Sequence, residues 1–369
     1  MKKIITSESV NIGHPDKTCD TIADAFLDAA LSSDPQAQMA VECAIKDDLL
    51  MIYGEATTTA DVDYDGIARG VLRDIGYTCE FQIIKKISAQ SPEINAAVVK
   101  EEVTANDQGI VYGYACDETA EFMPKPIMVA HALMRRYEEF RRTRPADYFA
   151  DAKCQVSIEY EDDKPVKCHT VLISVSHSDK LTNQQIRKDI LDNVIRKVDC
   201  GLDHSDCNII INPSGAFTIW GSHSDSGCVG RKIIVDTYGG VGRHGGGAFS
   251  SKNATKVDRS GAYYARYVAK NVVMAGLAKR CEIQVSYAIG LAHPLKVDIE
   301  TFGTNKKTHA EIVEFVNSNF DFRPANIIRE LDLLRPIYKQ TACYGHFGRP
   351  EFPWEGVAPP GNTRKTSRK

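Results

Sequence analysis

One arrangement of secondary structure recurs three times along the chain and constrains its fold more than any other feature. Apolar and polar residues alternate in segments that begin near Met39, Lys153 and Cys281, and such alternation predicts half-buried strands. A second short strand follows each of these segments, and a stretch with helical spacing comes after it. Because the residues themselves hardly repeat, the pattern predicts three related α+β domains of one architecture.

The predicted strands cover 39–45 and 49–55, 153–160 and 170–175, and 281–289 and 295–301, and the predicted helices cover 61–75, 183–198 and 309–320. Helices on one face of each antiparallel sheet would leave the other face to pack against another domain or subunit. These half-apolar faces therefore favour a dimer.

The most unusual composition lies between Gly227 and Asp258. Six of the nine residues from Gly239 to Gly247 are glycine, which leaves backbone N–H groups free to approach an anion. In a chain of formal net charge −4, a local excess of cations suits a compact polyanion such as a triphosphate better than a nucleic-acid surface. A flexible loop with solvated charges is the alternative. The surrounding cations are Arg231, Lys232, Arg243, Lys252, Lys256 and Arg259.

A dinucleotide-binding fold competes with this interpretation. Gly240, Gly242 and Gly245 match the spacing G-x-G-x-x-G after a strand-like run at 232–238. That fingerprint requires a helix at its third glycine, whereas helical spacing resumes here only at about Asp258. The Walker spacing is absent as well, so the stretch predicts a phosphate site of another kind.

A second candidate site lies near the beginning of the chain. Gly13-His14-Pro15 leads into apolar residues at helical spacing, so a helix is expected to begin there. His14, Asp16 and Lys17 would then lie together at a helix N-terminus, which is a natural position for anions and for a metal that accompanies them. A simple Asp cap beside an exposed histidine is the alternative.

The remaining composition describes an ordinary globular protein of 369 residues, of which 43% are hydrophobic. No apolar run approaches the roughly 18 residues of a membrane span, and MKKIITSESV lacks the apolar core of a signal peptide. We therefore expect a cytoplasmic protein without a membrane partner. Its eleven cysteines contain no C-x-x-C pair, which is typical of reduced thiols. Polar residues at 95–106 are expected to form a lid.

Six motifs stand in order along the chain: GHPDK at 13–17, DQGIVYGYA at 107–115, DAK at 151–153, GRKIIVDTYGG at 230–240, RHGGGAFS at 243–250 and KVDRS at 256–260. Together they resemble the S-adenosylmethionine synthetases, also called methionine adenosyltransferases, over nearly the whole chain. The resemblance implies that ATP and L-methionine are converted to S-adenosylmethionine, orthophosphate and pyrophosphate. It also implies three similar α+β domains around a pseudo-threefold axis, with flat sheets pairing in a dimer, or in a dimer of dimers, and active sites at the interface.

The resemblance assigns a role to each matching position, and it implies Mg²⁺, in two sites, and K⁺ as cofactors. The implied catalytic residues are His14, Lys153, Arg231, Lys252 and Lys256. ATP would contact His14, Asp151, Lys153, Phe217, Asp225, Arg231, Lys232, Ala248 and Lys252. Methionine would contact Glu55, Gln90, Asp107, Asp225 and Lys256, while Asp16 and Asp258 would bind Mg²⁺ and Glu42 would bind K⁺. The implied segments are an N-terminal domain at 1–92, an active-site loop at 93–106, a central domain at 107–218, a C-terminal domain at 219–357 and a basic tail at 358–369.

The chain departs from the family pattern in three places. Ala216 stands where the family usually has arginine, Trp220–Asp225 replaces the usual G-G-P-x-G-D, and the loop after Gln90 is short, with Asn106 in place of glycine. These changes affect the nucleoside end and the lid, whereas the phosphate end is intact. Two alternatives therefore accompany the synthetase: a paralogue that uses a methionine analogue or another nucleoside triphosphate, and a non-catalytic nucleotide-binding subunit.

Overall fold

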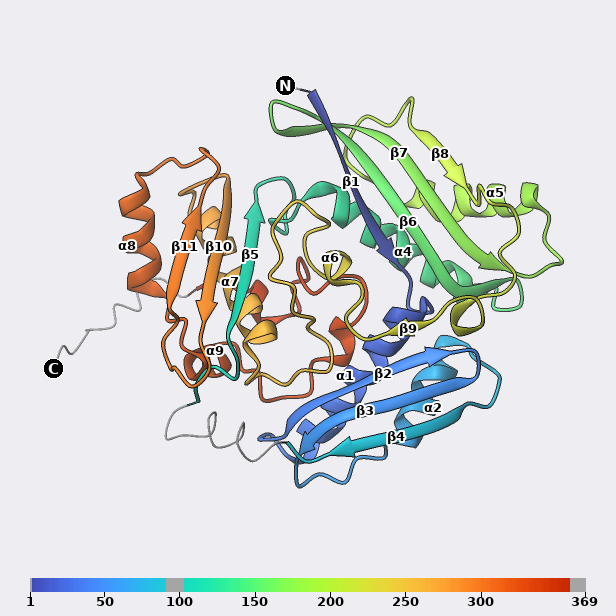
Figure 1. Ribbon diagram of the computed structural model, residues 1–369. Helices are drawn as coiled ribbons and strands as arrows, with labels where there is room; N and C mark the ends of the chain where they lie inside the picture. The colour runs from blue at the N-terminus through green and yellow to red at the C-terminus, as the bar shows by residue number, and fades with distance from the viewer. Residues whose placement is uncertain (1, 91–102, 359–369) are drawn as a thin grey trace.

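The computed structural model describes residues 2–90 and 103–358, and its strands form three separate sheets arranged around a common centre (Figure 1). The β6 sheet has the order β1 (Lys2–Val10), β6 (Tyr148–Glu161), β7 (Lys164–His177) and β8 (Asn208–Ile211). The β3 sheet has the order β4 (Gln82–Ser88), β3 (Leu49–Thr57), β2 (Gln38–Lys46) and β9 (Gly227–Cys228). The β10 sheet has the order β11 (Lys296–Glu300), β10 (Arg280–Tyr287) and β5 (Gly109–Cys116).

The predicted strand–strand–helix repeat is confirmed in all three places. Its helices are α2 (Tyr64–Ile75), α5 (Asn183–Asn193) and α8 (His309–Asn319). Several predicted boundaries were wrong, and the largest differences include the starts of β6 at Tyr148 and of β7 at Lys164, which were predicted at 153 and 170. The first helix begins later than predicted because the Asp63 carboxylate caps it by accepting from the Gly66 N–H. The second helix ends at Asn193, before a short 3₁₀ turn at Ile195–Lys197, and β10 ends before Ile289.

Each sheet combines strands from distant parts of the sequence. β1 pairs with β6 along its whole length, from Lys2 opposite Glu161 to Val10 opposite Lys153. β5 pairs with β10, and β9 pairs with the end of β2. The sheets therefore exchange strands across the sequence ranges expected for the three domains, and those ranges remain a proposal.

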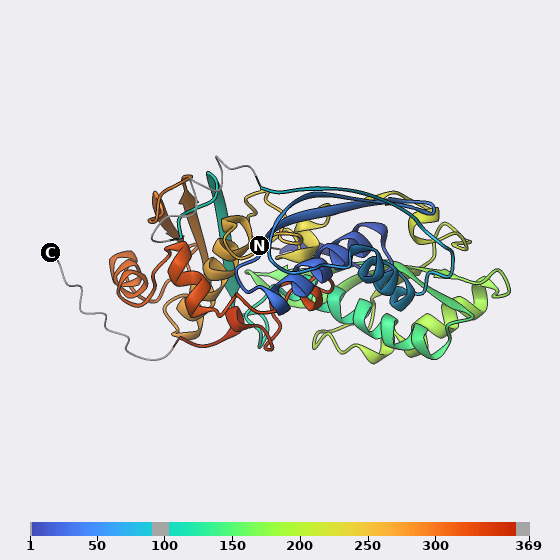
Figure 2. The ribbon, with the colours of Figure 1, turned by 90° about the horizontal axis from the view of Figure 1, so that it is seen from below.

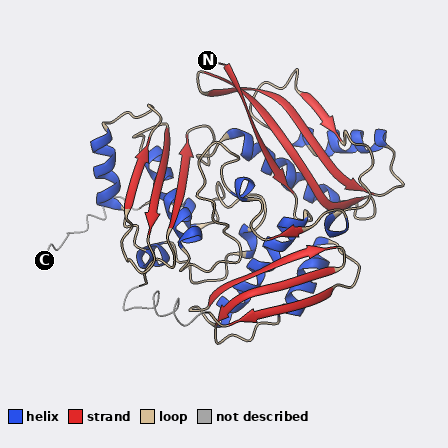
Figure 3. Ribbon diagram, in the orientation of Figure 1, coloured by secondary structure: helices blue, strands red, loops and turns tan. Residues whose placement is uncertain are grey.

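The helices lie on one side of the sheets, as the turned view shows (Figure 2; Figure 3 colours helices and strands separately). α1 (Pro15–Ser33) and α2 cover one face of the β3 sheet, and α4 (Lys125–Thr143) packs on the β6 sheet. The opposite faces expose large apolar side chains: Met51 and Ile84 on the β3 sheet are each 42% exposed, and Ile110 on β5 is 47% exposed. The chain thus leaves apolar sheet surface uncovered within its described part.

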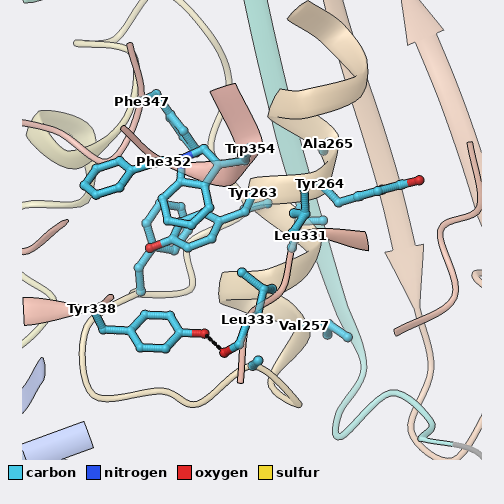
Figure 4. Close-up of a cluster of buried hydrophobic side chains, with 14 of the residues drawn as sticks. Val257, Tyr263, Tyr264, Ala265, Leu331, Leu333, Tyr338, Phe347, Phe352 and Trp354 are labelled. Carbon is cyan, nitrogen blue, oxygen red and sulfur yellow. Dashed lines mark hydrogen bonds between the residues drawn. The ribbon is translucent and has the colours of Figure 1, made fainter. Parts of the chain in front are cut away.

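α7 (Val257–Met274) packs against the β10 sheet and is buried almost all round. Figure 4 shows the aromatic cluster that holds it, in which Tyr263 stacks on Trp354 with ring centroids 3.8 Å apart. Nearby, the Tyr338 hydroxyl donates to the Leu333 carbonyl at 2.6 Å. The C-terminal segment, together with α9 (Pro324–Glu330), therefore fixes the helix whose first turn carries Asp258.

Two further expectations concern the chain as a whole. All eleven cysteines lie within the described residues and are free, so the prediction of reduced thiols without disulfides is confirmed. Among residues 2–90 and 103–358, every helix is too short or too polar to cross a membrane. The predicted lid and basic tail fall mainly on 91–102 and 359–369, which lie outside the described residues.

Candidate functional site

The first group of polar residues lies at the N-terminus of α1, as predicted. His14 caps the helix, and its Nδ1 accepts from the Asp16 N–H at 3.2 Å. The Asp16 carboxylate is buried, accepts from the Lys232 Nζ at 2.7 Å and from the Cys228 N–H at 3.0 Å, and lies 3.6 Å from Arg231 Nη1. A buried carboxylate therefore lies beside two cations from the glycine-rich stretch.

His14 is neutral in this setting. Burial, and after it the positive charge of Lys232, lowers the pKa of its imidazole to about 4, although the charge of Asp16 opposes both effects. Since Nδ1 accepts a hydrogen bond, the proton of the neutral ring is on Nε2. His14 can therefore donate one hydrogen bond to a ligand without adding a charge.

Asp151 and Lys153 on β6 face the same region. The Asp151 carboxylate accepts from the Gly221 N–H at 3.0 Å, and burial raises its pKa to about 6, against the effects of that hydrogen bond and of Lys153. Lys153 and Asp225 both act electrostatically on His14, so these side chains belong to the first group. Phe217 lies beside the end of β7, where its N–H donates to His177 Nε2 at 3.1 Å.

The departure at Trp220–Asp225 forms a well-anchored turn. The Ser222 N–H donates to the Tyr77 hydroxyl at 2.9 Å, and the Ser222 hydroxyl donates to the Asp47 carbonyl at 2.6 Å. The Trp220 ring packs on Tyr77, with centroids 4.7 Å apart. This turn therefore connects the β3 sheet to the Asp151 side of the first group.

The second group surrounds the start of α7. Lys252 Nζ donates to the Asp258 carboxylate at 2.6 Å, and the Lys252 backbone bridges to Ala40 on β2. Ala40 is the register partner of Glu55, so the sheet carries Glu55 to the same place. Burial lowers the pKa of Lys256, while the charges of Glu55, Asp258 and Asp107 act against that effect. The second group thus collects carboxylates and ammonium groups from β3, the start of β5, the glycine-rich stretch and α7.

The remaining predicted residues lie around these two groups. Gln90 follows β4, its N–H donates to the Thr57 hydroxyl at 3.2 Å, and its buried Oε1 has no hydrogen-bond partner among the described residues. Glu42 on β2 accepts from the Tyr53 hydroxyl at 3.4 Å. Ala248 lies beside Gly230, where an added Cβ would approach the Ala248 methyl carbon to 2.5 Å. An unsatisfied amide oxygen such as that of Gln90 is suited to a ligand that donates hydrogen bonds.

Two predictions about the glycine-rich stretch were wrong. The run at 232–238 is the short helix α6 (Ile233–Asp236) with its flanking turns, and it is not strand-like. Arg259 is fully buried against Asp24, at 2.8 Å, and so stabilises the fold. The helical pattern predicted an exposed Arg259, but the charged side of α7 is buried as well as its apolar side. Arg243 pairs with Glu282 at 3.2 Å but its side chain is 64% exposed, so its place among the cations stays a prediction.

Some glycines in this stretch are explained by packing within the protein. A Cβ at Gly247 would lie 2.3 Å from the Asp258 carboxyl carbon, and one at Gly245 would lie 1.7 Å from the Ile110 carbonyl oxygen. Only glycine permits such an approach. The stretch is consequently pressed onto β5 and α7, which places it beside Asp258.

The prediction that Lys17 joins His14 and Asp16 at an anion site was wrong, because two buried carboxylates take up its ammonium group. Lys17, fully buried, bridges Asp20 at 2.8 Å and Asp236 at 2.5 Å, and Asp20 also accepts from the Gly230 N–H at 2.9 Å. This network joins α1 to the turn that carries Arg231 and Lys232. Asp20 lies three residues after Lys17 on the same helix, but nothing local in the sequence indicated Asp236.

Two other residues of the second group carried a signal in the sequence. His244 lies close enough to Asp258 and Lys252 for both charges to act on it, although burial dominates and lowers its pKa. Its position in RHGGG was the available signal. Asn106, the departure from glycine, has a structural explanation, because its side-chain oxygen accepts from the Val257 N–H at 2.9 Å and so caps α7.

The donor set can be compared with the metals that the resemblance implies. Within the described chain, no three or more His, Cys, Asp or Glu side chains are arranged to hold a metal ion. Asp16 and Asp258 each offer carboxylate oxygens beside lysine. Mg²⁺ is commonly held by one or two carboxylates together with substrate phosphates, so these residues fit an ion that arrives with a phosphorylated substrate.

Fold and site define an α+β protein of three related units whose polar groups suit a phosphorylated small molecule. Models of the S-adenosylmethionine synthetase N-terminal, central and C-terminal domains match residues 2–103, 102–217 and 219–356. The chain is 48% identical to S-adenosylmethionine synthase of Clostridium tetani (strain Massachusetts / E88) in an alignment 383 positions long, gaps included, that covers 97% of each chain. It is 47% identical to S-adenosylmethionine synthase of Sorangium cellulosum (strain So ce56), over 95% of this chain and 86% of the relative. The chain belongs to the S-adenosylmethionine synthetase family.

Proposed function

We propose that the protein transfers the adenosyl group of ATP to the sulfur of L-methionine. The sulfur attacks the ribose C5′, the bond from C5′ to the triphosphate oxygen breaks, and the triphosphate is cleaved by water to orthophosphate and pyrophosphate. Family membership supports the reaction. The single observation that carries it in this chain is the pair of cation–carboxylate groups at Asp16 and Asp258.

The first group supports stabilisation of the leaving triphosphate. Lys232 and Arg231 lie against Asp16, where phosphate oxygens would become their partners, and Lys153 adds a further cation. A leaving group of several negative charges needs such fixed positive charge. Neutral His14 would donate from Nε2 toward the reacting sugar and phosphate region. The thioether sulfur needs no base, so positioning by these residues would carry the rate.

Asp16 and Asp258 would each hold Mg²⁺ together with phosphate oxygens, and Glu42 would hold K⁺. When bound, the divalent ions would neutralise the charge that develops on the triphosphate. Lys252, Lys256 and Arg231 would hold the remaining phosphate oxygens.

Methionine and the adenosine portion are assigned to the outer residues of both groups. Glu55 would accept from the methionine ammonium group, and the unpartnered Gln90 Oε1 suits a ligand donor. Asp107, Asp225 and Lys256 would complete that end, with Phe217 and Ala248 beside the nucleotide and Asp151 on the ATP side.

The active form would be a homodimer, or a dimer of dimers, that pairs the exposed sheet faces. Met51, Ile84 and Ile110 provide apolar area for such an interface. The hydrogen bonds and ion pairs described above join residues within the first group or within the second group, which supports sites built from the first group of one subunit and the second group of its partner. Free thiols support a cytoplasmic compartment.

One observation favours the paralogue that accepts another nucleoside triphosphate. Hydrogen bonds join the altered turn at Trp220–Asp225 to Asp151 through Gly221 and to Tyr77 through Ser222. The turn is therefore held in a fixed position beside Asp151, on the ATP side of the first group. Turnover of GTP or CTP at a rate equal to that of ATP would support this alternative, and a strong preference for ATP would exclude it.

Mixing two inactive variants tests the function and the shared site together. Lys232→Ala removes a cation from the first group and Lys252→Ala removes one from the second group. In random mixed dimers with a twofold interface, half of the dimers would contain one intact site, which restores about a quarter of the wild-type S-adenosylmethionine formation. Two inactive proteins that stay inactive after mixing, with exchange of subunits verified by mass, would contradict a site shared between subunits. Arg136→Ala, which breaks an exposed pair with Glu139, is the matched control and should retain full activity.

A further inference from the structure

A cavity of about 480 Å³ lies between α4, α5, β7 and β8, and none of the residues assigned above lines it. Its wall is mostly apolar and includes Leu133, Leu191 and Ile195, while Arg196 and His204 add polar groups. Three of the eleven cysteines, Cys168, Cys200 and Cys207, also line it. The reaction proposed above uses none of these side chains.

The Cys168 thiol interacts with both of the others. The Cys207 thiol donates to Cys168 Sγ at 3.6 Å, and the Cys168 thiol is hydrogen-bonded to the sulfur of Cys200. Cys168 and Cys200 are buried, so reagents would reach them through the cavity. The described residues contain no set of three or more His, Cys, Asp or Glu with a metal-binding arrangement, so the cluster is better suited to sulfur chemistry than to metal binding.

The hydrogen bonds make the three sulfurs unequal. The hydrogen bond from Cys168 lowers the pKa of Cys200 to about 6, against the effect of burial, and the charge of His204 adds to the lowering. The same hydrogen bond, together with burial, raises the pKa of Cys168. Thiolates attack disulfides and thiols do not, so Cys200 is the thiol prepared to react first.

We propose that Cys168, Cys200 and Cys207 form a thiol–disulfide exchange site for a low-molecular-weight disulfide that enters the cavity. The Cys200 thiolate attacks one sulfur of that disulfide, its S–S bond breaks, and one thiolate leaves and takes up a proton. Cys168 then loses its proton and attacks Cys200 Sγ, the mixed disulfide breaks, and the second thiol leaves. The products are a Cys168–Cys200 disulfide and two molecules of free thiol, so the external disulfide is reduced by the two electrons that the protein loses.

Cys207 is a positioning residue in this scheme. Its sulfur lies 3.6 Å from Cys168 Sγ and would hold that sulfur in place for the second step. Derivatisation of Cys200 also removes the interaction that raises the pKa of Cys168 most. The first step therefore prepares the second.

The test exposes the full-length protein to mixtures of oxidised and reduced glutathione, followed by acid quenching, intact-mass measurement and peptide mapping. We expect a mass decrease of two hydrogen atoms and a peptide that links Cys168 to Cys200. Cys168→Ser should trap glutathione on Cys200, Cys200→Ser should leave Cys168 and Cys207 reduced, and Cys207→Ser should slow formation of the Cys168–Cys200 link. Cys79→Ser removes an exposed thiol elsewhere and should leave the link unchanged.

Two results would overturn the proposal. One is glutathione on Cys79 alone, with the three cavity thiols still reduced. The other is a Cys168–Cys207 disulfide that forms in Cys200→Ser as fast as the Cys168–Cys200 disulfide forms in the wild type. Should a serine variant fail to fold, alkylation of the native wild type with iodoacetamide provides an independent measurement, in which Cys200 must react before Cys168.

Discussion

The buried ion pair between Asp24 and Arg259 provides a sharp prediction, because it holds the segment that presents Lys252. Both side chains are almost completely inaccessible, at 0% and 1% exposure, and two hydrogen bonds of 2.8 Å join them. Asp24 also accepts from the Ser251 N–H at 2.9 Å, and Arg259 donates to the Lys252 carbonyl at 3.1 Å. The pair therefore connects α1, α7 and the glycine-rich stretch.

Asp24→Asn keeps the size of the side chain but removes its charge. Arg259 retains neutral acceptors at Tyr263, Thr341 and Lys252, but a buried guanidinium without a counter-charge destabilises a protein by about 3–5 kcal/mol. We expect the free energy of unfolding, measured by urea titration at pH 7, to fall by that amount. S-adenosylmethionine formation should fall as well at temperatures where the variant is folded, because Lys252 loses part of its support.

Asp65→Asn is the matched control for this change. It breaks the ion pair of Asp65 with Lys85, whose side chains are 40% and 44% exposed, and exposed pairs contribute about 0–1 kcal/mol. A loss below about 1 kcal/mol for Asp24→Asn, equal to that of the control, would refute the reasoning about the buried pair.

The remaining predictions concern the site and its pH dependence. Lys252→Ala and Asp258→Asn should each lower kcat by about 10²-fold or more, since each removes leaving-group stabilisation. The circular dichroism spectra should be unchanged. Wild-type turnover in both variants would contradict the assigned site. Asp151 has a raised pKa of about 6 in place of 3.8, so its protonated form stabilises the fold, and this contribution is present below about pH 4 and is lost as the pH rises through 6. The difference between the two pKa values corresponds to about 3 kcal/mol. The free energy of unfolding of Asp151→Asn, measured by denaturant titration, should therefore rise by about that much relative to wild type between pH 4 and pH 7. Stabilities of variant and wild type that change with pH in parallel would contradict this prediction. Gly230→Ala should destabilise by about 1–3 kcal/mol in the same measurement, because φ is +78° and the new Cβ would meet Ala248 at 2.5 Å; a neutral effect would show that this contact relaxes freely.

Local patterns in the sequence predicted those parts of the fold that depend on neighbours in the chain. Alternation identified β2, β6 and β10 because one face of each strand is buried. The strand exchange between β1 and β6, or between β5 and β10, joins residues more than a hundred positions apart, and no local period records such pairing. The two-residue strand β9 is too short to show any alternation.

The candidate site divides in the same way. His14 and Asp16 were grouped correctly because a helix N-terminus brings neighbouring residues together. Lys232 and Lys252 were indicated by local charge, although charge could not distinguish them from Arg259, whose partner lies on α1. The supporting contacts of Lys17 with Asp236 and of Phe217 with His177 depend entirely on the tertiary fold.

The most direct test of the proposed reaction is a steady-state measurement with ATP, L-methionine, Mg²⁺ and K⁺ in which S-adenosylmethionine, orthophosphate and pyrophosphate are quantified together. The account predicts equal yields of the three products at every time point. Release of phosphate without S-adenosylmethionine would contradict it, because the triphosphate chemistry would then be serving a different acceptor.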